Sequence, residues 1–172
     1  RHPVGFPTDM SVAVPALLIA DSMDASSISF GTVMEAAYKI GHEKFHEYPA
    51  GSHYTFYSKL FNSVGIHLSM PVAGVSEVGT SMIVEKSPIG FVAQSCIRGT
   101  MGNPCMTCWK CFRKATLGLA LGLNVDSDVN LSNLLSTEVR SKLLAYPISH
   151  ENVVAFSMHR YPREGIDSGD SE

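Results

Sequence analysis

The sequence predicts a mixed α/β fold that forms part of an open parallel sheet, with a four-cysteine knuckle and a small helical extension. Short β-type runs alternate with longer helical patterns along the first two thirds of the chain, which is the order typical of parallel α/β folds. A polar link opens at residues 126–128, ahead of further helical patterns. We therefore expect a domain over 1–124, a helical extension over 125–161 and a disordered tail over 162–172.

The first elements follow from the spacing of apolar residues. Val12–Met23 is apolar nearly throughout, which predicts a buried helix that begins near Pro15. Ser27–Gly31 is a short β-type run. Met34–Glu47 has apolar residues at helical spacing, and Gly41 interrupts this helix in its middle.

The alternation continues through the middle of the chain. His53–Val64 predicts a helix, followed by Gly65 at its C-cap position and a strand over Ile66–Met70. Ser76 is a plausible N-cap for a helix that runs to about Glu85. The core face of the helix over His53–Val64 is expected to hold Phe56, Tyr57, Leu60, Phe61 and Val64.

The helical extension contains two helix candidates. These are Thr137–Ala145 and His150–Tyr161, and the second has Ser149 as its expected N-cap and Glu151 in its first turn.

Composition excludes several classes of protein. The 172 residues carry 13 Lys and Arg against 16 Asp and Glu, a formal net charge of −3, and 45% of them are hydrophobic. A disordered chain is less apolar, and a nucleic-acid coat protein is more basic. No apolar run approaches the roughly 20 residues that a bilayer crossing needs, and nothing at the start of the sequence resembles a secretion signal. We expect a cytoplasmic protein without membrane or direct nucleic-acid partners.

All four cysteines fall in one short window with the spacing C-x8-C-x2-C-x2-C. They are Cys96, Cys105, Cys108 and Cys111. Four thiolates this close in sequence can surround one tetrahedral metal ion, and a helix predicted over Trp109–Leu121 begins near the third or fourth of them. Two disulfides are the alternative, which the missing secretion signal disfavours. An iron–sulfur cluster is the rival metal group, but its common bacterial spacing differs. The spacing therefore favours Zn²⁺, and four thiolates leave no open position on it, so the ion is structural.

The cysteine window is also rich in cations. Between Lys86 and Val125 there is no Asp or Glu. A Zn²⁺ ion with four thiolates carries a net charge of −2, which the cations of the window offset with a surplus. Four of them are candidate contacts for a phosphate or a substrate carboxylate: Arg98, Lys110, Arg113 and Lys114.

The cysteine pattern, preceded by Ser95 and followed by Arg113 and Ala115, resembles the zinc site of the 7-cyano-7-deazaguanine synthases (QueC-like enzymes). The resemblance covers about residues 12–122 and rests mostly on the cysteines. Three upstream segments are also similar to the family: Ile28-Ser29-Phe30-Gly31, Tyr48-Pro49, and Pro71-Val72 followed by Val75-Ser76.

This resemblance implies a Rossmann-like open parallel sheet of the PP-loop ATP pyrophosphatases, an adenine nucleotide alpha-hydrolase-like fold. It further implies a structural Zn²⁺, ATP as co-substrate and a purine-like small-molecule substrate, and it is compatible with a homodimer. Such ligases adenylate a carboxylate on a deazapurine and convert it to an amide and then a nitrile, in queuosine-type nucleoside biosynthesis. The family's Ser-Gly-Gly-x-Asp-Ser phosphate loop is missing, and the chain opens with Arg1. We therefore expect the C-terminal part of a longer protein, with the missing N-terminal half as its partner.

The chain also departs from the family pattern. The Asp, Cys and Arg that follow Tyr-Pro in the family are replaced by Ala50, Gly51 and Ser52, and a family lysine is Glu77. The alternative is therefore a zinc-stabilised relative that has lost catalysis or changed its target, and that serves as a binding or assembly module. No catalytic residue is assigned from the sequence.

A competing motif, H-E-x-x-H, spans His42 to His46. On a helix the two histidines could hold Zn²⁺, with Glu43 as the general base of a peptidase. The preceding Gly41 weakens such a helix, and Lys44 places a cation beside the ion, so we favour a solvated helical face.

Other side chains receive simpler interpretations. Trp109 is expected to pack over the zinc site, with a stacking platform for a purine-like ring as the alternative. Four further histidines have no partner at ligand spacing and are expected to be surface or capping groups: His2, His67, His150 and His159.

Overall fold

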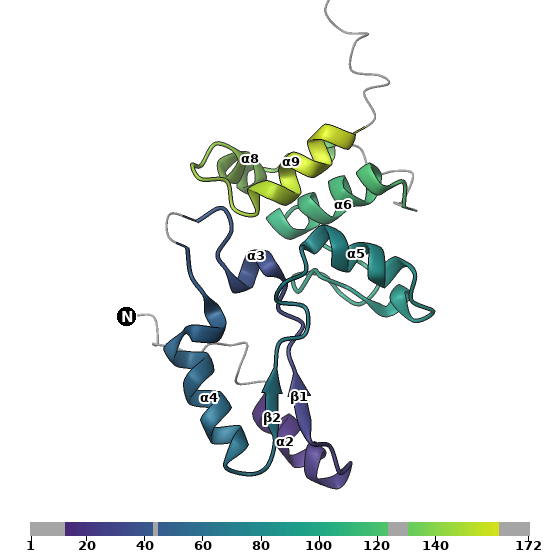
Figure 1. Cartoon of the computed structure of the whole chain (residues 1–172). Coiled ribbons are helices and arrows are strands. Elements are labelled where there is room, and N and C mark those ends of the chain that lie inside the picture. The colour runs from purple at the N-terminus through teal and green to yellow at the C-terminus, as the bar shows by residue number, and fades with distance from the viewer. Residues whose placement is uncertain (1–12, 43–44, 124–130, 162–172) are drawn as a thin grey trace, which may run out of the picture. The chain divides into compact units, whose positions relative to one another are not determined.

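The computed structural model describes residues 13–42, 45–123 and 131–161 (Figure 1). The chain divides into two compact units. Unit 1 consists of residues 1–39 and 44–76, and unit 2 consists of residues 40–43 and 77–172.

Unit 1 contains a two-stranded parallel sheet with helices packed against it. Its elements, in chain order, are α2 (Ala13–Ser22), β1 (Ser27–Ser29), α3 (Met34–Ala37), the 3-10 turn η1 (Tyr48–Ala50), α4 (Ser52–Asn62) and β2 (His67–Ser69). Strand β1 pairs with β2 so that Ile28 lies opposite Leu68. The core of the unit consists of Ala20, Tyr57, Phe61, Ile66 and Leu68, with Ile28 packed against it.

The two faces of this sheet differ in polarity. Ile28 and Leu68 belong to the apolar side, which α2 and α4 cover. On the other side the hydroxyls of Ser29 and Ser69 form a hydrogen bond of 2.7 Å. Alternation of side chains along a strand therefore gives one buried and one polar face.

Unit 2 is built around α6 (Trp109–Leu121). The other elements are α5 (Glu77–Glu85), the 3-10 turn η2 (Gly90–Val92), α7 (Leu131–Leu134), α8 (Thr137–Leu143) and α9 (Glu151–Arg160). Helix α6 packs against α9 along its length and also contacts α7 and α8, as Figure 1 shows for α6 and α9. The core consists of Trp109, Phe112, Ala115, Leu134, Val139 and Val154.

The mixed α/β class is confirmed, but the fold is mostly helical. Within the described residues the sheet has two strands, and the larger open sheet that the resemblance implies is not present among them. The two strands are separated by almost forty residues, and α4 lies between them in sequence. The helices of the expected extension share their core with α6.

Several local expectations were wrong in detail. Helix α2 is in place, but Leu18 is 80% exposed, so it is not a buried helix in this unit. Of the five residues expected on the core face of α4, only Tyr57 and Phe61 are buried. Because Ser52–Asn62 contacts β2 along a narrow stripe, the flanking apolar residues stay exposed: Phe56, Leu60 and Val64.

The helix expected over Met34–Glu47 ends at Ala37. Lys39 and Gly41 have positive φ angles of 57° and 73°, which no α-helix contains. A Cβ atom at position 41 would lie 2.1 Å from the carbonyl oxygen of Ile148, so this close approach requires glycine.

Helix ends were predicted with mixed success. Gly65 has a left-handed φ of 79°, as expected after α4, and α5 begins directly after Ser76. The N-cap of α9 is His150, with a φ of 60°, and not Ser149. The expected tail over 162–172 lies outside the described residues. None of the described helices combines the length and the apolar character that a membrane crossing requires.

Candidate metal centre

The four cysteine sulfurs converge on one point in unit 2. All four Sγ atoms lie within 4.8 Å of one another. The Sγ of Cys111 is 3.5 Å from that of Cys108 and 3.8 Å from that of Cys105. Tetrahedral ligands at the Zn–S distance of about 2.3 Å would place their sulfurs about 3.8 Å apart. The cluster therefore has the size that a four-thiolate metal site needs.

The two-disulfide alternative is wrong. All four cysteines are free, and three of them are buried. A disulfide would bring two sulfurs to about 2.05 Å.

The ligands come from a tight loop and the start of a helix. Cys108 is the N-cap of α6, and Cys111 lies in its first turn. The loop between Cys96 and Cys105 folds back on itself, since the N–H of Asn103 donates to the C=O of Thr100 at 2.9 Å. This arrangement confirms the predicted helix over Trp109–Leu121 and its start near the third ligand.

Gln94 holds the ligand loop in shape. Its side-chain N–H groups donate to the carbonyls of Cys96 and Thr100, each at 3.0 Å. Its side-chain oxygen accepts from the N–H of Gly102 at 2.7 Å. One amide side chain thus satisfies three backbone groups between residues 96 and 102, which stabilises the shape of this loop.

Gly99 allows the loop to close. A Cβ atom there would lie 2.2 Å from the carbonyl oxygen of Asn103 and 2.9 Å from the backbone nitrogen of Cys105. Any larger residue would push apart the two backbone segments that carry the first and second ligands.

Backbone groups favour the thiolate form at the loop. A backbone hydrogen bond from Thr107 lowers the pKa of Cys105 to about 6. The N–H of Cys105, 3.4 Å from the Sγ of Cys96, lowers the pKa of Cys96. Burial raises the pKa of Cys111 to about 12. A bound metal ion deprotonates such a thiol outright, so the burial of Cys111 does not exclude it as a ligand.

Trp109 follows Cys108 and belongs to the core of unit 2. Its ring is 9% exposed and stacks on Phe112, with the centroids 5.4 Å apart. The guanidinium of Arg113 lies over the same ring at 5.9 Å. These two contacts and the low exposure of the residue support a packing residue over a free stacking platform.

Arg98 connects the ligand loop to α8. It forms an ion pair with Glu138, whose other oxygen accepts from the backbone N–H of Trp109 at 3.3 Å. The hydrogen bond from Arg98 holds the pKa of the Glu138 carboxyl below its usual value. A second connection comes from Ser136, which donates to the C=O of Thr107 at 2.7 Å while capping α8.

A carboxylate that the sequence does not mark as a site residue lies against two of the cations. Glu77 is 5% exposed, and its oxygens lie 3.2 Å from Arg113 and 3.2 Å from Lys114. Lys114 also donates to the hydroxyl of Ser81 at 2.9 Å. Glu77 thus pairs with two of the four candidate cations. Lys110, one turn earlier on α6, is exposed. The only sequence signal for Glu77 was its departure from the family pattern.

A family model matches residues 56–170, which include every cysteine, α5 and α9. The chain belongs to a family of unknown function (DUF6395). No curated protein and no solved structure matches the chain.

The H-E-x-x-H motif lies before the DUF6395 match. Glu43 and Lys44 are outside the described residues, while His42 and His46 are exposed and belong to no described helix. Neither His42 nor His46 therefore lies on the helix that a zinc peptidase motif needs.

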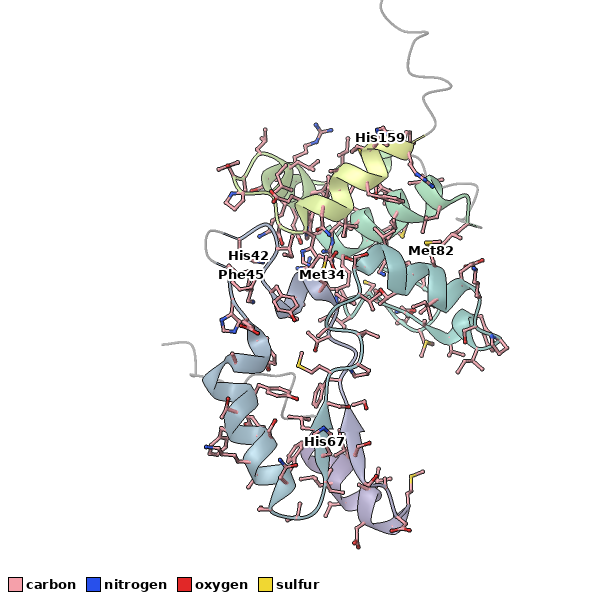
Figure 2. All side chains as sticks on the ribbon, in the orientation of Figure 1. Met34, His42, Phe45, His67, Met82 and His159 are labelled. Atoms are coloured by element: carbon pink, nitrogen blue, oxygen red, sulfur yellow. The ribbon has the colours of Figure 1, made fainter. Side chains whose placement is uncertain are left out.

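Four other histidines were expected to be surface or capping groups, and the structure describes three of them. His67 on β2 and His159 on α9 are exposed, as expected, and Figure 2 shows both. His150 is partly buried, with its Nδ1 2.9 Å from the hydroxyl of Ser149. His2 lies outside the described residues.

Proposed function

We propose that the four cysteines hold one structural Zn²⁺, and that the chain is the zinc-bearing part of an ATP-dependent enzyme related to the 7-cyano-7-deazaguanine synthases. The observation that carries the proposal is the convergence of four sulfurs, spaced C-x8-C-x2-C-x2-C, within 4.8 Å. The family resemblance rests on that spacing, and the convergence of the four sulfurs is what binding of a single metal ion requires.

The donor set fits zinc better than a hard cation. Four sulfur ligands are typical of Zn²⁺ or an iron–sulfur cluster, and Mg²⁺ and Ca²⁺ prefer oxygen. A single tetrahedral ion matches the sulfur separations of 3.5 and 3.8 Å. With four protein ligands the ion has no position for water, so its contribution is to fix the loop and the start of α6.

The proposed reaction joins a deazapurine carboxylate to AMP and releases pyrophosphate. Ammonia then displaces AMP and leaves an amide. A second ATP adenylates the amide oxygen, and loss of AMP and a proton leaves the nitrile. The carboxylate oxygen is a poor leaving group until it is joined to phosphate, which is why ATP is needed. The phosphate loop for ATP would come from a part of the protein outside this chain.

Two of the candidate cations are best suited to contact an anion. Lys110 is exposed, and Arg98 is 59% exposed although paired with Glu138. Arg113 is buried against Glu77, and Lys114 shares the same carboxylate. We assign Lys110 and Arg98 to substrate or phosphate contact, and Arg113 to the fold.

A second candidate function is a non-catalytic or retargeted binding and assembly module. Glu77 favours it. The synthases have a lysine where this chain has Glu77, and here that carboxylate pairs with both Arg113 and Lys114. A substrate carboxylate approaching these cations would meet a like charge.

Native mass spectrometry tests the metal centre. We expect one zinc per chain in the wild type and none in Cys108→Ala. Ile97→Ala is the matched control, because Ile97 lies in the same loop, is 90% exposed and is not a ligand. Zinc retained by Cys108→Ala, or iron with inorganic sulfide in the wild type, would overturn the zinc assignment.

ATP–pyrophosphate exchange separates the two functions. The assay uses the full-length gene product with a carboxylated deazapurine, and the enzyme proposal expects exchange that Lys110→Ala weakens. Absence of exchange with every carboxylate tested, in a protein that still holds zinc, favours the binding module. Proteolysis abolished by Glu43→Gln would instead support the peptidase.

A further inference from the structure

The four cysteines of the knuckle differ in their access to solvent. Three of them are buried: Cys96 and Cys108 are each 6% exposed, and Cys111 is 5% exposed. Cys105 is only partly buried. It is therefore the cysteine that a dissolved molecule reaches most directly. The susceptibility of a metal-binding thiolate to oxidants increases with its exposure.

A second sulfur lies close to that of Cys105. The Sγ of Cys105 is 3.8 Å from the Sγ of Cys111, which lies in the first turn of α6. A disulfide bond requires the two sulfurs to approach to about 2.05 Å, so a movement of the loop by about 2 Å closes the gap. The partly exposed cysteine thus has a buried partner with which it can form a disulfide.

Two contacts that hold the start of α8 come from the segment between these sulfurs. The hydroxyl of Ser136, the N-cap of α8, donates to the C=O of Thr107 at 2.7 Å. The backbone N–H of Trp109 donates to the carboxylate of Glu138, in the first turn of α8, at 3.3 Å. Both backbone groups belong to residues 105–111. A change in the backbone of this segment therefore acts directly on the start of α8.

We propose that the four-cysteine knuckle is a redox switch. A hydroperoxide oxidises the sulfur of Cys105, a disulfide forms between Cys105 and Cys111, and the metal ion leaves. The inference rests on the Zn²⁺ centre proposed above and adds regulation to it. A disulfide between these two positions closes a small ring that contains Thr107 and Trp109. It therefore moves the two backbone groups that hold the start of α8.

The oxidation takes place in two steps. The Cys105 thiolate attacks one oxygen of hydrogen peroxide, so that the O–O bond breaks, the S–O bond of a sulfenic acid forms and hydroxide leaves. The Cys111 thiolate then attacks the Cys105 sulfur, so that the S–S bond forms, the S–O bond breaks and a second hydroxide leaves. Two protons from the solvent convert both hydroxides to water. Two electrons thus pass from the pair of sulfurs to the peroxide.

The disulfide removes two of the four ligands. The thiolate is the form of cysteine that binds a metal ion, so Cys96 and Cys108 alone remain to hold the zinc. Structural zinc sites use four protein ligands, and two thiolates do not retain the ion. A thiol reductant opens the disulfide by exchange, after which the four thiolates bind zinc again. The switch is therefore reversible as long as Cys105 is not oxidised beyond the sulfenic acid.

Native mass spectrometry and peptide mapping of the wild-type chain, treated with an equimolar amount of hydrogen peroxide, test the proposal. We expect bound zinc before treatment, and its loss in step with a disulfide between Cys105 and Cys111. Amide hydrogen exchange in α8 should accelerate by about tenfold or more, whereas exchange in α4, which belongs to unit 1, should not change. Absence of zinc before treatment would overturn the metal centre itself. Zinc that stays bound after the peroxide is consumed would overturn the switch alone.

Histidine substitutions identify the reacting sulfur. Histidine replaces one cysteine in the Cys₃His class of structural zinc sites, so such variants keep four ligands. Cys105→His lacks the partly exposed thiol and should release zinc to peroxide about tenfold more slowly than the wild type. Cys96→His, at a buried ligand, is the matched control and should release zinc at about the wild-type rate. Equal rates for the two variants, or a first disulfide in the wild type that does not contain Cys105, overturn the proposal.

Discussion

The carboxylate of Glu77 and the guanidinium of Arg113 lie 3.2 Å apart, and each side chain is about 5% exposed. Glu77 begins α5 and Arg113 lies in α6, so the pair joins two helices of unit 2. Two buried charges are costly to remove from water, and each depends on the other for compensation.

Glu77→Gln should therefore destabilise the protein strongly. The variant keeps the shape of the side chain but leaves Arg113 buried without its counter-charge, which costs about 3–5 kcal/mol. Urea denaturation measures the free energy of unfolding. Glu85→Gln, at an exposed position of the same helix, should change it by less than about 0.5 kcal/mol. Equal effects of the two substitutions would show that the pair is not what holds α5 to α6.

Cys108→Ala should unfold the cysteine segment over residues 95–115. Thiolate coordination in small zinc sites contributes on the order of 10 kcal/mol, and Cys108 is both a ligand and the N-cap of α6. Circular dichroism should show loss of helix and a lower melting temperature. A chelator should produce the same change in the wild type. Unchanged melting with unchanged zinc content would falsify this prediction.

His150 should make stability fall in mild acid. Burial lowers the pKa of His150 to about 4, whereas an unfolded histidine titrates near pH 6.5. Between these values the unfolded chain binds the proton more readily. The contribution of neutral His150 to the free energy of unfolding is therefore complete above about pH 6.5, and it is lost as the pH falls towards 4.

Comparing variants separates the loss of stability caused by protonation of His150 from the loss caused by acid release of the proposed metal. His150→Asn should show a smaller loss of melting temperature between pH 7 and 5 than the wild type, and asparagine accepts the positive φ at this position. His159→Asn, an exposed histidine of the same helix, should behave as the wild type does. Identical pH profiles for all three proteins would contradict the assignment.

Gly99→Ala should weaken metal binding. The new Cβ would lie 2.2 Å from the carbonyl oxygen of Asn103, so the loop must open between the first two ligands. We expect a destabilisation of about 1–3 kcal/mol, the usual cost of overpacking, together with faster zinc release to a chromogenic chelator. At Gly74 a Cβ atom would meet nothing within 4 Å, so Gly74→Ala is the control and should release zinc at the wild-type rate.

The features that could be predicted from the sequence were local ones. The spacing of four cysteines was sufficient to predict the cluster. The proline-free run from Trp109 to Leu121 predicted α6 with its observed bounds. In both cases the residues that decide the structure lie within about sixteen positions of one another.

The features that could not be predicted depend on distant partners. The burial of Glu77 requires α6, which begins over thirty residues later, and an acidic residue at a helix start normally indicates an exposed group. Similarly, the apolar pattern of α2 predicted burial, but the pattern does not reveal whether the covering surface belongs to the same unit. The number of strands in the sheet also depends on pairing between segments that are far apart in the sequence.

Cys108 is the third cysteine of the knuckle and the N-cap of the longest described helix. Forming the first turn of a helix is the unfavourable step in helix formation, and here the N-cap and the first turn hold two of the proposed ligands. If these sulfurs bind the proposed Zn²⁺, coordination of the ion and nucleation of α6 are one event. Helices α8 and α9 pack against α6. A newly synthesised chain would therefore complete unit 2 only as fast as the cell delivers the proposed ion. Trace-metal supply would then determine how much mature protein accumulates.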